Sequence, residues 1–201
     1  IGFCLLLLGC ASQQPSSPAT PAVNETGDSG VIGMNTTSKA PAEIAVLETN
    51  MGTIEIELNR KKAPVTVENF VQYVKSGQYD GTIFHRVIDG FMIQGGGFTP
   101  DGKEKGVRAP IKLESANGLK NAVGAIAMAR TNDPDSATSQ FFINVADNAF
   151  LNYAPGNPGY AVFGTIVSGM DAVNKIKGVQ TTTKGYNENW PVQDVIIQKA
   201  Y

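Results

Sequence analysis

The feature that most constrains the fold of this chain is a series of short apolar runs separated by turn dipeptides. Each of these dipeptides has an Asp or Asn, whose side chain can accept a hydrogen bond from the nearby backbone, followed by a Gly, which tolerates positive φ. They are Asp80-Gly81, Asp89-Gly90, Asp101-Gly102 and Asn117-Gly118. The apolar runs are short, so we expect strands at 91–94, 111–113, 125–129, 140–145, 161–166 and 192–198. Strands and helices do not alternate regularly, which argues against a doubly wound sheet.

In other segments, apolar residues recur at the spacing of a strand or of a helix. Ile54, Ile56 and Leu58 alternate with acids, which predicts a half-buried strand, paired with 45–48 across a turn at 50–52. Apolar side chains at helical spacing predict a helix that begins at Pro64 and ends before Gly77, and a second helix over 170–177. About eight strands and two helices favour a mainly β fold, a closed eight-stranded antiparallel barrel capped by two helices, over residues 43–201.

Composition excludes several function classes. The net charge of −2 gives no support to nucleic-acid binding. Two cysteines and one histidine exclude most zinc sites, iron–sulfur clusters and disulfide scaffolds, so we expect neither a metal nor another cofactor. The triple glycine 95–97 lacks the Lys-Ser/Thr of a phosphate loop and is interpreted as a tight turn. A Ser-His-Asp triad could use only His85, and no serine has a nucleophile-elbow setting, so His85 is expected to be a packed, hydrogen-bonded ring.

The first ten residues form an apolar run that is too short to span a bilayer and ends in Leu7-Leu8-Gly9-Cys10. This resembles the bacterial lipobox, in which the cysteine sulfur is acylated and the chain is cut just before it. The alternatives are an ordinary signal peptide or a buried apolar segment. The lipobox implies that residues 1–9 are the end of a signal peptide and are removed, that Cys10 carries the lipid, and that Cys4 is lost, so that no disulfide can form.

Residues 10–42 continue with a segment rich in Ser, Thr and Pro and without aromatic residues. Such a composition cannot bury enough surface to order itself, and it predicts a tether with a reach of about 30 Å. The protein is therefore expected in the bacterial cell envelope, attached to a membrane through its lipid. Ala11 is not the aspartate that retains enteric lipoproteins in the inner membrane, so by analogy a Gram-negative host would place it in the outer membrane, facing the periplasm.

Several ordered blocks of sequence resemble one known family. The segment Phe84-His85-Arg86-Val87-Ile88-Asp89-Gly90-Phe91-Met92-Ile93-Gln94-Gly95-Gly96 resembles the signature of the cyclophilins, a family of peptidyl-prolyl cis–trans isomerases. Ser139-Gln140-Phe141-Phe142-Ile143 and Tyr160-Ala161-Val162-Phe163-Gly164 resemble two further family blocks. The resemblance covers about residues 43 to 200 and is strongest to bacterial periplasmic members. It implies the family's eight-stranded barrel and an isomerase of X–Pro bonds in proline-containing polypeptides.

The resemblance also implies roles for individual residues. Arg86 matches the catalytic arginine, Gln94 matches a side chain that binds the substrate and holds that arginine, and Gln140 matches another polar residue of the groove. The walls of the proline pocket are matched by Phe91, Met92, Phe142 and Leu151. The stretch Met128-Ala129-Arg130 matches the part that meets the peptide backbone through main-chain atoms, with Arg130 where eukaryotic members often have asparagine.

Two positions of the groove differ from the eukaryotic pattern. Phe150 stands where tryptophan is common, and Tyr160 stands where histidine is common. The family tryptophan donates its indole N–H to cyclosporin, and phenylalanine has no such donor. We therefore expect weak cyclosporin binding with isomerase activity retained.

The chain is thus expected to be a monomeric, lipid-anchored isomerase that speeds the folding of exported proteins. One alternative is a module or chaperone of the envelope that only binds proline-containing segments, with incidental turnover. Another is an envelope scaffold or adhesin with a degenerate pocket, against which the intact pocket residues argue. An Arg86→Ala protein that still performs the cellular task would favour the binding module.

Overall fold

The computed structural model describes residues 42–201. The predicted signal segment, the predicted lipid attachment at Cys10 and nearly all of the predicted tether lie outside the described residues. Within 42–201, no helix is long and apolar enough to cross a membrane.

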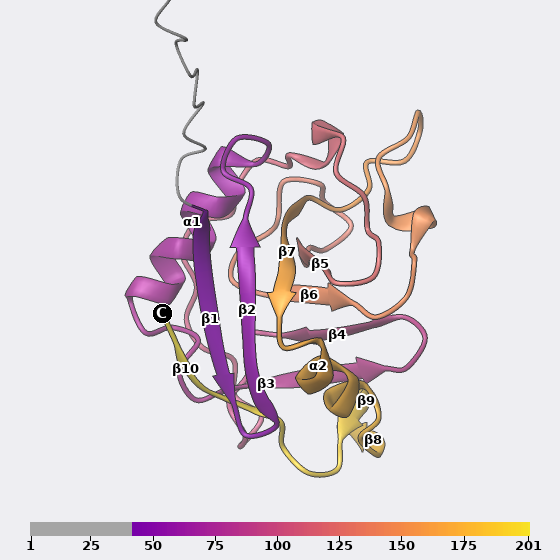
Figure 1. Ribbon diagram of the computed structural model, residues 1–201. Helices are drawn as coiled ribbons and strands as arrows, with labels where there is room; N and C mark the ends of the chain where they lie inside the picture. The colour runs from indigo at the N-terminus through magenta and orange to yellow at the C-terminus, as the bar shows by residue number, and fades with distance from the viewer. Residues whose placement is uncertain (1–41) are drawn as a thin grey trace, which may run out of the picture. The chain divides into compact units, whose positions relative to one another are not determined.

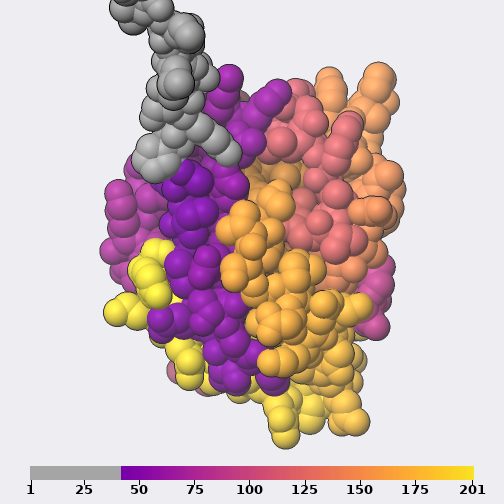
Figure 2. All heavy atoms as spheres, viewed as in Figure 1, coloured from indigo at the N-terminus to yellow at the C-terminus, as the bar shows by residue number. Residues whose placement is uncertain are grey.

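Eight antiparallel strands close into a barrel, which confirms the predicted fold class (Figure 1). Their order around the barrel is β1 (Glu43–Thr49), β10 (Ile196–Ala200), β3 (Thr82–Ile88), β4 (Met92–Gly95), β6 (Phe141–Asn144), β5 (Ala125–Met128), β7 (Val162–Ser168) and β2 (Gly52–Leu58). Because β1 pairs with β10 and β2 pairs with β7, the two ends of the domain lie side by side. Figure 2 shows β1, β2 and β7 together on one outer face.

An aromatic cluster fills the interior beneath the first helix, α1 (Pro64–Lys75). Phe70 of α1 is fully buried, and its ring centroid lies 5.1 Å from Tyr79, 5.7 Å from Phe141 and 5.0 Å from Phe163. These tilted and edge-on contacts are the arrangements that aromatic rings favour. The interior of the barrel is therefore a packed core, and a substrate site must lie outside it.

The ends of α1 agree with the sequence pattern, although its N-terminal cap comes from elsewhere. Pro64 occupies the first turn, and Gly77, with φ of +68°, follows the last turn. Ala63 offers no capping side chain. Instead, the Glu114 carboxylate accepts hydrogen bonds from the backbone N–H groups of Val65 and Thr66, at 3.1 and 2.8 Å. A carboxylate at this end satisfies free donors and complements the helix dipole.

The remaining elements show where the sequence patterns hold and where they do not. α2 (Met170–Lys177) has the predicted bounds. The periodicity did not predict the barrel strand β3, the 3₁₀ helices or the small second sheet. The 3₁₀ helices are η1 (Ser115–Asn117) and η2 (Ala149–Leu151), and the second sheet consists of β8 (Thr181–Lys184) and β9 (Asn187–Pro191). The strand predicted at 111–113 is wrong, since only an isolated bridge between Ile111 and Ala137 forms there. The strand predicted from 192 begins only at Ile196.

Candidate active site

A row of facing residues crosses four neighbouring strands of the barrel. Arg86 of β3 lies opposite Gln94 of β4, Gln94 lies opposite Phe142 of β6, and Phe142 lies opposite Ala127 of β5. Residues directly opposite in a sheet share a face, so this row lies on one side of the barrel wall. Met92, two positions before Gln94, shares the same face.

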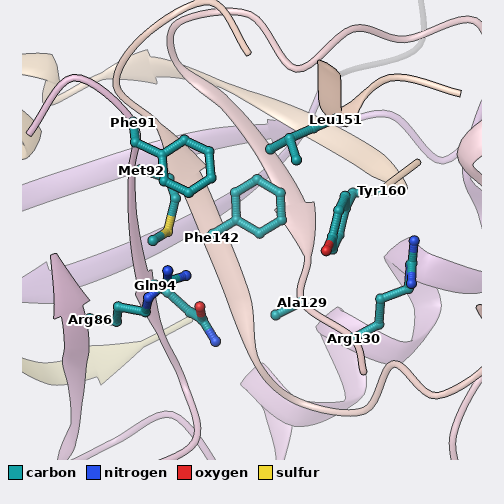
Figure 3. Close-up of a pocket in the computed structure, with 9 residues that line it drawn as sticks. All are labelled: Arg86, Phe91, Met92, Gln94, Ala129, Arg130, Phe142, Leu151 and Tyr160. Atoms are coloured by element: carbon teal, nitrogen blue, oxygen red, sulfur yellow. The ribbon is translucent and has the colours of Figure 1, made fainter. Parts of the chain in front are cut away.

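Beneath and beside this row is a second apolar cluster, separate from the main core. Its buried members are Met92, Ala125, Ala127, Phe142, Leu151 and Val162. It supports a surface pocket of about 130 Å³, which is comparable to cavities that admit a benzene ring. Nine residues line the pocket: Arg86, Phe91, Met92, Gln94, Ala129, Arg130, Phe142, Leu151 and Tyr160 (Figure 3). The pocket can therefore hold a five-membered apolar ring, with Arg86 and Gln94 at one end and Arg130 at the other.

The far wall of the pocket is held by a side-chain contact that the sequence analysis missed. The Tyr160 ring meets Phe142 edge-on, with centroids 5.5 Å apart. The Arg130 guanidinium lies 4.5 Å from the centroid of the Tyr160 ring. Nε and Nη2 of Arg130 also donate to the Gly159 carbonyl at 3.1 and 2.8 Å. Besides its predicted main-chain role, Arg130 thus braces Tyr160 through its side chain.

Three buried asparagines form a hydrogen-bond network that connects the other walls of the pocket. No sequence motif predicted this network. Asn148 Nδ2 donates to the Phe91 carbonyl at 2.8 Å and to Asn144 Oδ1 at 2.7 Å. Asn144 Nδ2 in turn donates to Asn121 Oδ1 at 3.2 Å, and Asn121 Nδ2 donates to the Leu151 carbonyl at 3.0 Å. A satisfied buried network of this kind fixes the backbone of two pocket segments relative to each other.

Of the two arginines that line the pocket, Arg86 is the one whose guanidinium is not engaged by another residue of the described part. Its side chain is partly exposed and, among residues 42–201, forms no hydrogen bond or ion pair. The expected contact in which Gln94 holds the arginine is not present: Gln94 Nε2 donates to Gln140 Oε1 at 2.9 Å instead. Gly97 makes room for that pair, because a Cβ atom there would lie 2.6 Å from Gln140 Cγ.

His85 precedes Arg86 and is buried. Its ring centroid lies 4.6 Å from Phe98 and 6.0 Å from Trp190, and the ring forms a hydrogen bond with the backbone of Ile83, so the predicted packing and hydrogen bonding are both present. Nδ1 has no partner among residues 42–201. Burial, and secondarily the charge of Arg86, lower the pKa of His85 from 6.5 to about 4. The imidazole is therefore neutral at neutral pH.

This pKa predicts a pH dependence of stability. Because the folded-state pKa lies below the ordinary value, the unfolded chain takes up the proton first as the pH falls. The free energy of unfolding should therefore fall between pH 6.5 and 4, by about 3 kcal/mol in total at low pH. Urea unfolding of the wild type and of His85→Gln at pH 7 and 4.5 measures this. The variant should lose much less stability than the wild type, and equal losses would contradict the assignment.

Three of the residues predicted for the substrate groove lie outside the lining of this pocket. Met128 points into the main core and is 2% exposed, because it alternates with outward-facing Ala127 and Ala129 along the strand. Gln140 lies in a neighbouring cavity and reaches this site through Gln94. Phe150 lies at the rim, 65% exposed, with its ring stacked 5.7 Å from Phe91. The described residues contain no group of three or more His, Cys, Asp or Glu side chains that could hold a metal ion.

A closed eight-stranded barrel with an apolar pocket and an arginine on its outer wall defines the cyclophilin class. The family model "Cyclophilin type peptidyl-prolyl cis-trans isomerase/CLD" matches residues 44–201. The chain belongs to this family, and its activity is peptidyl-prolyl cis–trans isomerisation.

Similar proteins agree in sequence and in structure. The chain is 59% identical over 157 residues to a peptidyl-prolyl cis-trans isomerase of Streptomyces antibioticus, covering 77% of this chain and 95% of that protein. It is 54% identical over 160 residues to peptidyl-prolyl cis-trans isomerase B of Escherichia coli, covering 78% and 98%. Since that relative consists almost entirely of the matched part, we expect residues 42–201 to fold without a further segment.

A solved structure is also similar. It is a cyclophilin type peptidyl-prolyl cis-trans isomerase of Cryptosporidium parvum, determined in the presence of the dipeptide Ala-Pro, and it matches with a TM-score of 0.65 and 27% identity. The match covers 79% of this chain and 97% of that chain.

Proposed function

We propose that this isomerase accelerates X–Pro isomerisation during the folding of exported proteins, that Arg86 stabilises the twisted transition state, and that a lipid on Cys10 holds the enzyme at an envelope membrane. The observation that carries the mechanism is the Arg86 guanidinium, which is free of protein partners among residues 42–201 and lines an apolar pocket.

Catalysis of X–Pro isomerisation requires only a hydrogen bond that is stronger in the twisted state of the peptide bond than in the planar state. A peptide bond resists rotation because the nitrogen lone pair is delocalised into the carbonyl, which gives a barrier of about 18–20 kcal/mol. When the bond twists, the nitrogen becomes pyramidal and its lone pair becomes an acceptor. A donor aimed at that nitrogen binds the twisted state better than the planar one and so lowers the barrier. No bond breaks and no proton is lost, so no cofactor is required.

Arg86 has the properties that this role requires. A guanidinium carries a positive charge and presents several donors in a rigid, planar fork. Met92 and Phe142, which are 2% and 4% exposed, supply an apolar floor for the prolyl ring. A ring seated there displaces water that would compete for the guanidinium. The residue before proline then rotates while the ring stays in place.

The proposed location rests on the N-terminal sequence. The apolar run ends in Gly9-Cys10, and a segment with the composition of a tether follows. A lipidated cysteine would keep the enzyme at a membrane surface, where exported chains emerge unfolded. With Ala11 after the cysteine, a Gram-negative host would place it in the outer membrane, facing the periplasm. The slow exchange of X–Pro bonds, about 10–100 s, is the folding step that it would shorten.

Labelling with a fatty-acid analogue tests the location. In a bacterial host that expresses the chain, the wild type and a Cys4→Ser variant should incorporate the label and sediment with membranes. Cys10→Ser should lose the label and become soluble, because the acceptor sulfur is gone. Label that persists in Cys10→Ser, or that is absent from the wild type, would contradict the anchor.

The weak cyclosporin binding expected from Phe150 stays a prediction. Its side chain is exposed at the rim beside Phe91 but offers no hydrogen-bond donor. Cyclosporin should inhibit the wild type only above micromolar concentrations, and Phe150→Trp should lower the inhibitory concentration by about tenfold, as one hydrogen bond allows. Inhibition curves on an Ala-Pro peptide measure both, and submicromolar inhibition of the wild type would refute the prediction.

A further inference from the structure

A second cavity, of about 380 Å³, adjoins the proline pocket. Arg86 and Gln94 line both, so the two cavities meet at the Arg86 end of the pocket. A peptide whose proline fills the first pocket and whose chain continues on the Arg86 side would pass these two residues, and that flank of the substrate would meet the second cavity.

Two carboxylates line this cavity without partners. Glu104 and Glu188 are exposed, and neither side chain forms a hydrogen bond or ion pair with another residue of the described part. His85, which is 5% exposed and has an unpartnered Nδ1, also lines the cavity. At neutral pH His85 is neutral, so two negative charges face the single positive charge of Arg86. The charged residues that line the cavity therefore leave it with a net negative charge, which favours a cation beside the two carboxylates.

The two carboxylates are held by segments that are tied together. Glu104 pairs through its backbone with Phe98, and Glu188 lies on β9, which packs beside β3 (Figure 1). Lys184 Nζ donates to the Pro100 carbonyl at 3.0 Å and joins the β8–β9 hairpin to the loop that carries Glu104. Tyr186, fully exposed at the same hairpin, also lines the cavity and can contact the apolar stem or the charge of a long cationic side chain.

We propose that this cavity is a specificity subsite for a lysine or arginine side chain that flanks the substrate proline, with Glu104 and Glu188 as its charge partners. The proposal rests on the proposed placement of proline beside Arg86. Exposed ion pairs are individually weak, so we expect each carboxylate to contribute about threefold to the preference for a cationic peptide.

Blocked Ala-Ala-Pro-Ala-Ala peptides test the subsite, with lysine, neutral norleucine or glutamate placed at each flanking position in turn. Exchange NMR gives kcat/KM of residues 42–201 for each peptide. The readout is the ratio of kcat/KM for the lysine peptide to kcat/KM for the norleucine peptide. A variant that loses activity on all peptides equally leaves this ratio unchanged. On one flank the ratio should be about tenfold in the wild type and should fall toward one in 0.5 M salt. Glu104→Gln and Glu188→Gln should each lower it about threefold, and the double variant should bring it near one.

Asp171→Asn removes an exposed carboxylate on α2, outside the lining of the second cavity; it is the matched control for the loss of one negative charge and should keep the wild-type ratio. A ratio near one on both flanks of the wild type would overturn the subsite while leaving the isomerase intact. A double variant that keeps the full ratio, or a control that loses it, would also overturn the subsite. A wild type that accelerates none of the peptides would overturn the proposed placement of proline beside Arg86 together with the subsite.

Discussion

Replacing Arg86 by alanine is expected to lower kcat/KM for an Ala-Pro peptide by about 10²–10³-fold. That range is the usual effect of removing one positioned donor that acts mainly in the transition state. The pocket floor is formed by other residues, so peptide binding should weaken much less than turnover. The rate of cis-to-trans exchange with residues 42–201 at saturating and low peptide concentrations measures the two effects separately.

Two further variants make this test specific. Arg86→Lys keeps the charge and loses the planar fork, so its activity should lie between those of the wild type and the alanine variant. Arg108→Ala removes an exposed arginine that lies over Tyr73, away from the pocket, and should retain full activity. Equal rates for Arg86→Ala and the wild type would leave the isomerase and remove the proposed mechanism. A folded domain without any activity would favour the binding module.

Replacing Phe70 by alanine is expected to have the largest effect on stability. The ring is fully buried and contacts Tyr79, Phe141 and Phe163, all of which are also buried. Its removal from a packed core should cost about 3–5 kcal/mol, a large part of the roughly 5–15 kcal/mol that stabilises an ordinary domain. The free energy of unfolding from urea titration measures this loss.

Phe150→Ala is the matched control, because the same side chain is removed from a position that is 65% exposed. Its cost should stay below about 1 kcal/mol. Similar losses for the two variants would mean that the aromatic cluster around Phe70 does not dominate the core.

The elements that the sequence predicted well are those with one buried face. The β1–β2 hairpin, α1 and α2 each repeat apolar residues at the period of the element, and their predicted positions agree with the structure. Exposed β8 has no apolar face, and β3 is buried on both faces over its first four residues, so neither shows the alternation of a half-buried strand. The run at 111–113 is apolar because Ile111 packs against the main core, which requires no strand.

For the site, the family resemblance named all nine residues that line the pocket beside Arg86, and the roles that it implies for them stay predictions. What it could not supply is how they are held. The brace of Arg130 against Tyr160 and the chain of three asparagines depend on contacts between segments that are far apart in sequence. The hydrogen bond of Gln94 with Gln140, where Arg86 was the expected partner, likewise depends on the space that Gly97 leaves for the Gln140 side chain.

The position of the pocket on the outer wall of the barrel determines how a client protein can present itself. Phe91 and Tyr160 are partly exposed, so a chain can lie across the pocket sideways, with both of its flanks leaving along the open surface. No chain end has to be threaded through the enzyme. Prolines in the middle of a long polypeptide, including those in surface loops of a nearly finished fold, are therefore as accessible as prolines near a terminus. An open pocket of this kind therefore sets no requirement on the distance between a proline and the end of its chain.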